Sequence, residues 1–127
     1  MSAPYVLVVD DHPVNCKLVS YTLEARGIAT RSARDAAEAL VAVESEAPAV
    51  ILMDVQLPGV DGLTLTRQLR EDPRFARVPI VALTAYAMAS DEHAAREAGC
   101  DAFMSKPVDT RALGDLVVEL LARAGGS

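Results

Sequence analysis

Short apolar segments alternate with longer segments of helical spacing along this chain. The clearest short segments are Tyr5 to Asp10, Ala49 to Asp54 and Pro79 to Thr84, all rich in aliphatic residues. Continuous apolar runs of this length are typical of strands that are buried on both faces of a sheet. Weaker segments of the same kind are Ile28 to Ser32 and Asp101 to Met104. The pattern therefore predicts five strands.

Two helices are predicted between the first three strands. The first begins at Pro13, because proline is favoured at the first helical position, and it ends before Gly27. The second follows Asp35, whose side chain can cap a helix, and it ends before Pro48, which cannot continue one. The residues predicted to face the core are Val14, Leu18 and Tyr21 in the first helix and Ala36, Leu40, Val43 and Ala47 in the second.

Three further helices are predicted in the second half of the chain. The third runs from about Leu63 to Glu71, and the fourth runs from about Ser90 to Ala98 and is ended by Gly99. The fifth begins near Thr110 and repeats apolar residues at intervals of three and four. These repeated residues are Leu113, Leu116, Val117, Leu120 and Leu121.

Strict alternation of strands and helices predicts an α/β fold with a parallel sheet and helices on both faces. We expect the flavodoxin-like, doubly wound topology with five helices and strand order 2-1-3-4-5. Ligands of such folds bind beyond the carboxyl ends of the strands, at the point where the strand order reverses. The 127 residues have the length of one domain, and no linker or repeat divides residues 1-127.

Charge and cysteine usage exclude several classes of function. A formal net charge of -6 lacks the basic surface that binding to nucleic acid or to an anionic membrane requires. No apolar run has the length of a membrane span, and the N-terminus has no signal-peptide pattern. Cys16 and Cys100 have no zinc-site spacing, which favours two reduced, partly buried thiols. We therefore expect a soluble cytoplasmic protein with neither nucleic-acid nor membrane partners.

Polar residues follow four of the predicted strands at the point where each strand ends. Asp10 and Asp11 come at the end of the first strand, Asp54 ends the third, Thr84 ends the fourth, and Lys106 follows the fifth. Because the carboxyl ends of parallel strands meet at one edge of a sheet, these five side chains should converge there. An adjacent aspartate pair is by itself more often a turn signal, but its combination with Thr84 and Lys106 indicates a site.

Three converging carboxylates would repel one another and raise their pKa values unless a cation neutralised them. A hard divalent ion such as Mg2+, which prefers a few carboxylates and waters, fits this set of ligands. A metal, a hydroxyl and an ammonium group in one crevice are suited to bind a phosphoryl group. We therefore expect a carboxylate to attack phosphorus and form an aspartyl phosphate.

These motifs resemble those of response-regulator receiver domains over essentially the whole chain. The matching residues are the Asp10-Asp11 pair, "LMDVQLPGVDG" around Asp54, "ALTA" with Thr84 and "SKP" with Lys106. Each motif is weak alone, but their identity, order and spacing together are highly specific. The blocks "LMDVQLP", "TAYAM" and "SKP" also resemble the single-domain cell-cycle regulators of the DivK-like group.

The resemblance implies a two-component or phosphorelay switch in which Asp54 is the phosphoacceptor. The donor would be a phosphohistidine on a sensor histidine kinase or on a histidine phosphotransfer protein. Thr84 and Lys106 would bind the phosphoryl oxygens, and the Lys106-Pro107 bond would be cis, a form that is affordable only before proline. The Mg2+ ligands that the resemblance implies are Asp10, Asp11, Asp54 and the backbone carbonyl of Gln56.

The resemblance also implies residues that modulate the switch. Phe103 occupies the position of an aromatic switch residue that responds to Thr84, with a core aromatic as the equally weighted alternative. A downstream partner would bind the face made by the fourth helix, the fifth strand and the fifth helix, which the apolar run Ala85 to Ala89 borders. Gln56 and Tyr86 should flank the path of the attacking water, and neither carries a carboxylate, so we expect slow self-hydrolysis.

Other polar and glycine residues have simpler structural explanations. The segment "LPGVDG" is a turn in which Gly59 and Gly62 supply positions that tolerate positive φ. His12 and His93 have no partner at the spacing of metal ligands and are expected on the surface, with His12 close enough to the crevice to feel its charge. Cys16 and Cys100 are expected to act as small apolar fillers.

Three other functions compete with a free-standing switch. The chain could be a receiver module of a hybrid histidine kinase that relays phosphate to a phosphotransfer protein. A phosphatase of the haloacid-dehalogenase type also uses an aspartate nucleophile, but it needs a second aspartate where Gln56 stands. A flavin carrier is disfavoured because the loop after the first strand is acidic. We therefore expect no enzyme beyond self-phosphorylation from a donor and slow self-dephosphorylation.

Overall fold

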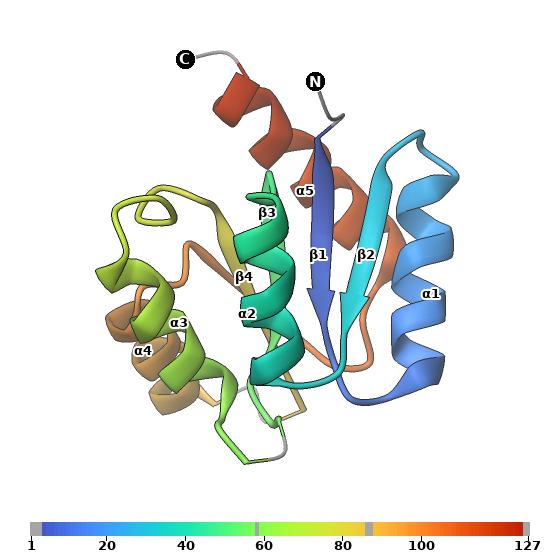
Figure 1. Cartoon of the computed structure of the whole chain (residues 1–127). Coiled ribbons are helices and arrows are strands. Elements are labelled where there is room, and N and C mark those ends of the chain that lie inside the picture. The colour runs from blue at the N-terminus through green and yellow to red at the C-terminus, as the bar shows by residue number, and fades with distance from the viewer. Residues whose placement is uncertain (1–3, 58, 86–87, 126–127) are drawn as a thin grey trace.

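Five parallel strands form the centre of the fold, and five helices cover them (Figure 1). The computed structural model describes residues 4–57, 59–85 and 88–125. Every predicted strand and helix is present, with ends that differ from the prediction by no more than about two residues. In chain order the elements are β1 (Tyr5–Val9), α1 (Pro13–Glu24), β2 (Ala29–Ala33), α2 (Ala36–Ser45), β3 (Val50–Asp54), α3 (Gly62–Glu71), β4 (Ile80–Thr84), α4 (Ala89–Ala98), β5 (Ala102–Ser105) and α5 (Thr110–Gly125).

The strands pair in the order β2-β1-β3-β4-β5, which confirms the predicted flavodoxin-like topology. All four pairings are parallel, so the carboxyl ends of the strands lie at one edge of the sheet. Asp54 is opposite Leu83 on β4, and Thr84 is opposite Ser105 on β5. The register therefore brings the polar ends of β3, β4 and β5 to the same level.

Side chains of β1 alternate between two hydrophobic clusters, one on each face of the sheet. Tyr5, Leu7 and Val9 pack into a cluster with residues of α2, α3 and α4, whereas Val6 and Val8 pack with residues of α1 and α5. Figure 1 shows the same division, with α2 in front of the sheet and α5 behind it. Each fully buried aliphatic side chain contributes about 2 kcal/mol to stability. This two-sided burial holds the strand ends, and so the site, in place.

The core-facing side of α1 differs from the prediction. Val14 is 77% exposed and Tyr21 is 72% exposed, and Leu18 is also exposed, so the predicted apolar face points to solvent. The residues that α1 buries are Cys16, Val19 and Leu23. Two apolar stripes run along this helix, and spacing alone does not determine which one faces the sheet. In the structure the buried stripe includes Cys16, whose thiol donates a hydrogen bond to the carbonyl of Asp10 over 3.3 Å.

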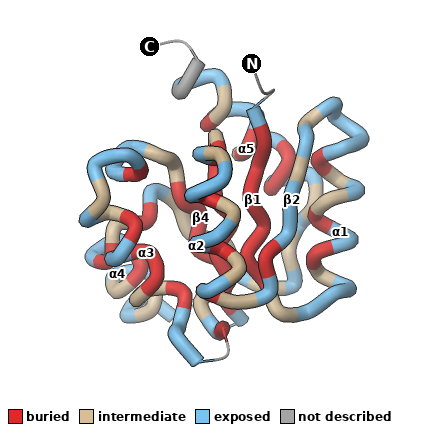
Figure 2. The backbone as a smooth tube through the Cα atoms, viewed as in Figure 1, coloured by how far each residue is buried: buried red, intermediate tan, exposed pale blue. Residues whose placement is uncertain are grey.

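Two smaller expectations about burial are also wrong. In α2 the buried residues are Ala36, Ala39 and Val43, whereas Leu40 is exposed and Ala47 lies beyond the end of the helix. The strand β2 is at the edge of the sheet and is largely exposed rather than buried on both faces (Figure 2).

The predicted Asp35 cap of α2 is present, since the Asp35 side chain accepts a hydrogen bond from the backbone N–H of Glu38.

Cys16 and Cys100 are both buried and form no disulfide. Both residues join hydrophobic clusters, as small fillers on opposite faces of the sheet. Within the described part of the chain, no helix has the length and apolar character that crossing a membrane demands.

Candidate functional site

Lys106 brings together the carboxylates at the ends of β1 and β3. Its Nζ atom lies 3.1 Å from Asp10 Oδ2 and 3.2 Å from Asp54 Oδ2. Asp10 is 2% exposed and Asp54 is fully buried, so both acids depend on this cation to offset the cost of burial. Asp10 is further fixed by its backbone N–H, which donates to the carbonyl of Ala33 at the end of β2.

Two carboxylates, Asp10 and Asp54, face one ammonium group, so their negative charges are not fully neutralised. The pKa shifts of Asp54 and Lys106 differ in their causes. Burial raises the pKa of Asp54, and this effect exceeds the opposing effects of the Gln56 N–H hydrogen bond and the Lys106 charge. Burial by itself would lower the pKa of Lys106, but its hydrogen bond to Asp10 and the charges of Asp10 and Asp54 raise it. Lys106 is therefore held in its charged form, while Asp54 lacks full compensation for its negative charge.

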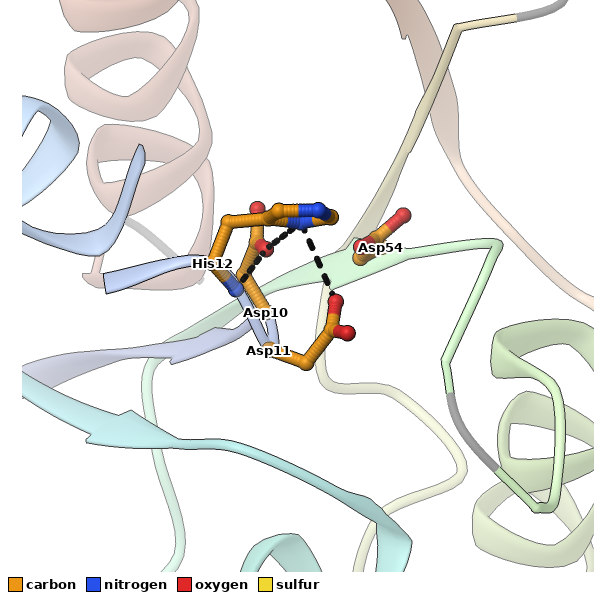
Figure 3. Close-up of side chains that lie close together, drawn as sticks. All are labelled: Asp10, Asp11, His12 and Asp54. Carbon is orange, nitrogen blue, oxygen red and sulfur yellow. Dashed lines mark hydrogen bonds and ion pairs between the residues drawn. The ribbon is translucent and has the colours of Figure 1, made fainter. Parts of the chain in front are cut away.

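His12 and Asp11 complete the acidic edge (Figure 3). The His12 Nδ1 atom lies 3.1 Å from Asp11 Oδ1 and 3.2 Å from Asp10 Oδ1, and the backbone N–H of His12 donates to Asp10 Oδ1. His12 is exposed, as predicted, but its ring lies directly against both carboxylates. The expected closeness of His12 to the crevice is therefore confirmed, and the structure adds a direct contact with each of the two carboxylates.

One potential ligand atom from each of Asp10, Asp11, His12 and Asp54 lies within 4.8 Å of the others, so these residues could hold a metal ion. Asp11 Oδ1 and Asp54 Oδ2 are buried atoms that accept no hydrogen bond from any described residue. Lys106 Nζ lies 3.2 Å from Asp54 Oδ2 and His12 Nδ1 lies 3.1 Å from Asp11 Oδ1, and both oxygens keep lone pairs for a ligand bond. Carboxylate oxygens suit a hard divalent cation, so the residues present fit the metal that the sequence predicted.

The loop after β3 packs directly against the backbone of Asp54. Gly62, the first residue of α3, donates its N–H to the carbonyl of Val55 over 3.0 Å. A Cβ atom at Gly62 would overlap the carbonyl of Asp54 and would touch the side chain of Met53. Gly59 has a φ of 79°, as predicted, but Gly62 has no positive φ. The predicted reason for a glycine at position 62, a positive φ, was therefore wrong. Glycine is needed there because it lets α3 begin directly against the backbone of Asp54.

Gln56 connects Asp54 with Thr84 through hydrogen bonds. The backbone N–H of Gln56 donates to Asp54 Oδ1, and its side-chain Nε2 donates to Thr84 Oγ1, each over 3.0 Å. Thr84 is 1% exposed, and its carbonyl accepts a hydrogen bond from the N–H of Lys106. The Lys106-Pro107 peptide bond is cis. Direct contacts therefore join four predicted residues into one group: Asp54, Gln56, Thr84 and Lys106.

The predicted modulating residues are placed only in part. Phe103 is half-buried in β5 and packs against the cluster on the α2, α3 and α4 face, which is consistent with either of its two expected roles. Met88 at the start of α4 is 69% exposed, and Val118 on α5 is exposed as well, on two of the elements predicted to bind a partner. Tyr86 lies outside the described residues.

A doubly wound sheet with acidic residues, a threonine and a lysine at its carboxyl edge defines the receiver class of signalling domains. The chain belongs to the response regulator receiver domain family, which matches residues 6–118. As a receiver domain it is a signalling module of two-component regulatory systems rather than a classical enzyme.

Individual relatives agree with this assignment. The polar-differentiation response regulator DivK of Brucella anthropi is 42% identical over 103 residues, which cover 81% of this chain and 84% of that protein. A CheY-like receiver domain protein of Methanospirillum hungatei has a TM-score of 0.89 at 27% identity, with 98% of each chain covered. The receiver domain of a signal transduction histidine kinase from Syntrophus aciditrophicus has a TM-score of 0.87 at 30% identity, with 95% of this chain and 92% of that chain covered.

The raised pKa of Asp54 leads to a prediction about stability without metal. Above its folded pKa the buried Asp54 is ionised and weakens the fold, and this penalty disappears as the pH falls through that pKa. We expect Asp54→Asn to be more stable than wild type at pH 7 in the presence of a chelator, because Lys106 keeps its contact with Asp10. The difference should shrink toward low pH. Urea denaturation across this pH range measures it.

The control for this prediction is Asp115→Asn, which makes the same chemical change at an exposed aspartate on α5. We expect it to show no such gain in stability at pH 7. An Asp54→Asn variant that is less stable than wild type at pH 7, or a difference that does not depend on pH, would contradict the argument.

Proposed function

We propose that this protein is a phosphorylation-operated switch that accepts a phosphoryl group from a phosphohistidine onto Asp54. The observation that carries this proposal is the state of Asp54 Oδ2, a buried carboxylate oxygen that accepts no hydrogen bond from the described residues and lies 3.2 Å from Lys106 Nζ. An oxygen with available lone pairs beside a fixed ammonium group is suited to attack phosphorus, because the cation stabilises the charge that arrives with the phosphoryl group.

The transfer breaks the bond between phosphorus and the histidine nitrogen and forms a bond between phosphorus and a carboxylate oxygen of Asp54. The histidine nitrogen keeps the electron pair of the broken bond. Lys106, which Asp10 holds in position, would bind one phosphoryl oxygen, and the hydroxyl of Thr84 would donate a hydrogen bond to another. Mg2+ would neutralise part of the phosphoryl charge when bound. Its proposed ligands are Asp10, Asp11, Asp54 and the backbone carbonyl of Gln56.

A phosphatase of the haloacid-dehalogenase type is not supported by this site. Such an enzyme needs a general acid two residues after its nucleophile, and Gln56 has no acidic proton. The Gln56 side chain is instead engaged with Thr84. The product on Asp54 would therefore be retained as a signal, with slow self-hydrolysis, rather than released at each turnover.

Two kinds of protein could contain this receiver domain. The match to DivK covers 84% of that protein, which supports a regulator that consists of little more than a receiver domain. A receiver module of a hybrid histidine kinase is the second candidate, which the similarity to the kinase receiver domain of Syntrophus aciditrophicus supports. In either setting the donor is a sensor histidine kinase or a histidine phosphotransfer protein. The two buried free thiols are consistent with a cytoplasmic location.

The donor has to cover the edge of the sheet, because its phosphohistidine must reach a carboxylate oxygen of Asp54. Leu18 of the exposed apolar stripe on α1 lines a cavity of about 70 Å3 together with Asp10 and Lys106. Val14 and Tyr21 extend this stripe along the helix. We therefore assign the α1 stripe to the donor, and we assign the face of α4, β5 and α5, where Met88 is exposed, to a downstream partner.

Acetyl phosphate with Mg2+ tests the phosphoacceptor directly. We expect one phosphoryl group per chain, acid-stable and base-labile, because an aspartyl phosphate is an acyl phosphate. The adduct should be absent in Asp54→Asn, and intact-protein and peptide mass spectrometry would locate it. Steady turnover of added phosphoesters would instead favour a phosphatase, and an unchanged adduct in Asp54→Asn would contradict the proposed acceptor.

Substitution of the α1 stripe tests the assignment of the donor surface. We expect Val14→Glu to slow phosphoryl transfer from a histidine phosphotransfer protein by about tenfold or more, as the loss of an apolar interface contact does. Labelling by acetyl phosphate should be unaffected, because that donor needs no docking surface. Val41→Glu on α2 is the matched control, since Val41 is 71% exposed and Val14 is 77% exposed. Equal slowing of transfer by both variants would contradict the assignment.

A further inference from the structure

Gln56 contacts two functional parts of the site at once. Its backbone N–H donates to Asp54 Oδ1, and its side-chain Nε2 donates to Thr84 Oγ1. The backbone contact lies within the loop after β3, whereas the side-chain contact crosses to the end of β4, 28 residues further along the chain. One residue therefore links the carboxylate that would accept the phosphoryl group with the hydroxyl that would bind it.

Thr84 is held firmly through its backbone, while its hydroxyl can change partner. Its carbonyl accepts a hydrogen bond from the N–H of Lys106 over 2.7 Å, and its main chain belongs to β4 between β3 and β5. Rotation about χ1 moves the hydroxyl without moving the strand. A hydroxyl has one proton to donate and two lone pairs, and the Gln56 amide occupies one lone pair. This contact helps to hold the Thr84 side chain in its present rotamer.

Phosphorylation would introduce a stronger partner for the same hydroxyl. The proposed role of Thr84 is to donate a hydrogen bond to a phosphoryl oxygen on Asp54. A hydrogen bond to an ionised acceptor is about twice as strong as one between neutral groups. The bond from Gln56 is neutral, and the Gln56 side chain is exposed and therefore free to leave. The contact is thus strong enough to bias the resting state and weak enough to be exchanged.

We propose that Gln56 is a positioning residue that latches the Thr84 hydroxyl in the resting state and gives it up when Asp54 is phosphorylated. The release step rests on the proposed function, whereas the latch itself is a property of the resting protein. The latch favours the present rotamer of Thr84, so it adds a cost to any rotation of the hydroxyl toward a phosphoryl oxygen. It therefore makes the switch less sensitive to weak or accidental phosphorylation. This regulation acts through Thr84, separately from any effect of Gln56 on hydrolysis.

The resting latch is tested without metal or phosphate. Gln56→Met keeps the length of the side chain and removes its amide, so we expect the methyl and backbone amide resonances of Thr84 to shift in the NMR spectrum. Gln68→Met on α3 is the matched control, since Gln68 is also an exposed glutamine, and Thr84 should not respond to it. Unchanged Thr84 resonances in Gln56→Met would overturn the latch.

The release step is tested with beryllium fluoride and Mg2+, which together form a stable analogue of an aspartyl phosphate. We expect Gln56→Met to bind the analogue about threefold to tenfold more tightly than wild type, the factor that one neutral hydrogen bond in the resting state provides. The same substitution in a Thr84→Val background should give no gain, because no hydroxyl remains to be released. Fluorine NMR titrations measure the four affinities.

An equal gain from Gln56→Met in both backgrounds would overturn the inference, because Gln56 would then act by a route other than Thr84. Weaker binding in the Gln56→Met single variant would overturn it as well. Failure of wild type to bind the analogue would overturn the proposed function, and the release step with it. The resting spectra report on the latch contact by themselves, so the two failures are distinguishable.

Discussion

The ammonium group of Lys106 between two buried carboxylates is the contact on which the rest of the site depends. It lies 3.1 Å from Asp10 and 3.2 Å from Asp54, both almost inaccessible to water. One cation cannot balance two acids and the neighbouring Asp11, so the edge of the sheet keeps an excess of negative charge. The raised pKa of Asp54 is a direct consequence of its burial in this setting. A divalent cation at the four-residue cluster would remove the excess and leave Asp54 able to attack phosphorus.

The parallel sheet explains why these groups meet. Each strand ends at the same edge, and both hydrophobic clusters fix the strands so that the polar ends have no freedom to separate. Gly62 lets α3 begin directly against the Asp54 carbonyl, and Gln56 connects the same loop to the end of β4. The fold therefore supplies rigid positions, and the short loops at its edge supply the contacts that can change. A switch needs both properties.

The sequence predicted the arrangement of elements and most of the edge residues, because both follow from one-dimensional patterns. Buried strands give continuous apolar runs, and a polar residue at the end of such a run must lie at the edge where parallel strands end. The spacing of apolar residues predicted the wrong buried face for α1. This helix has two apolar stripes, and only packing determines which one is buried. The error is informative, because the exposed stripe is the surface now assigned to the donor.

The contacts of Gln56, Gly62 and His12 could not be predicted from the sequence, for a different reason. They depend on the path of short loops and on the direction of single side chains, neither of which has a periodic signal. His12 was expected near the crevice, yet the contact of its ring with both Asp10 and Asp11 depends on one rotamer. The hydrogen bond from Gln56 to Thr84 joins segments that are far apart in the chain, so no local pattern encodes it.

Calorimetric titration with Mg2+ measures whether the crowded carboxylates at this edge form a cation site. We predict saturable binding of one ion per chain to the unphosphorylated protein. We also predict binding at least about tenfold weaker for Asp11→Asn, which removes a partly exposed carboxylate and leaves the contacts of Lys106 intact. Saturable binding that is equally tight in wild type and Asp11→Asn, or no binding to wild type, would contradict the cation site.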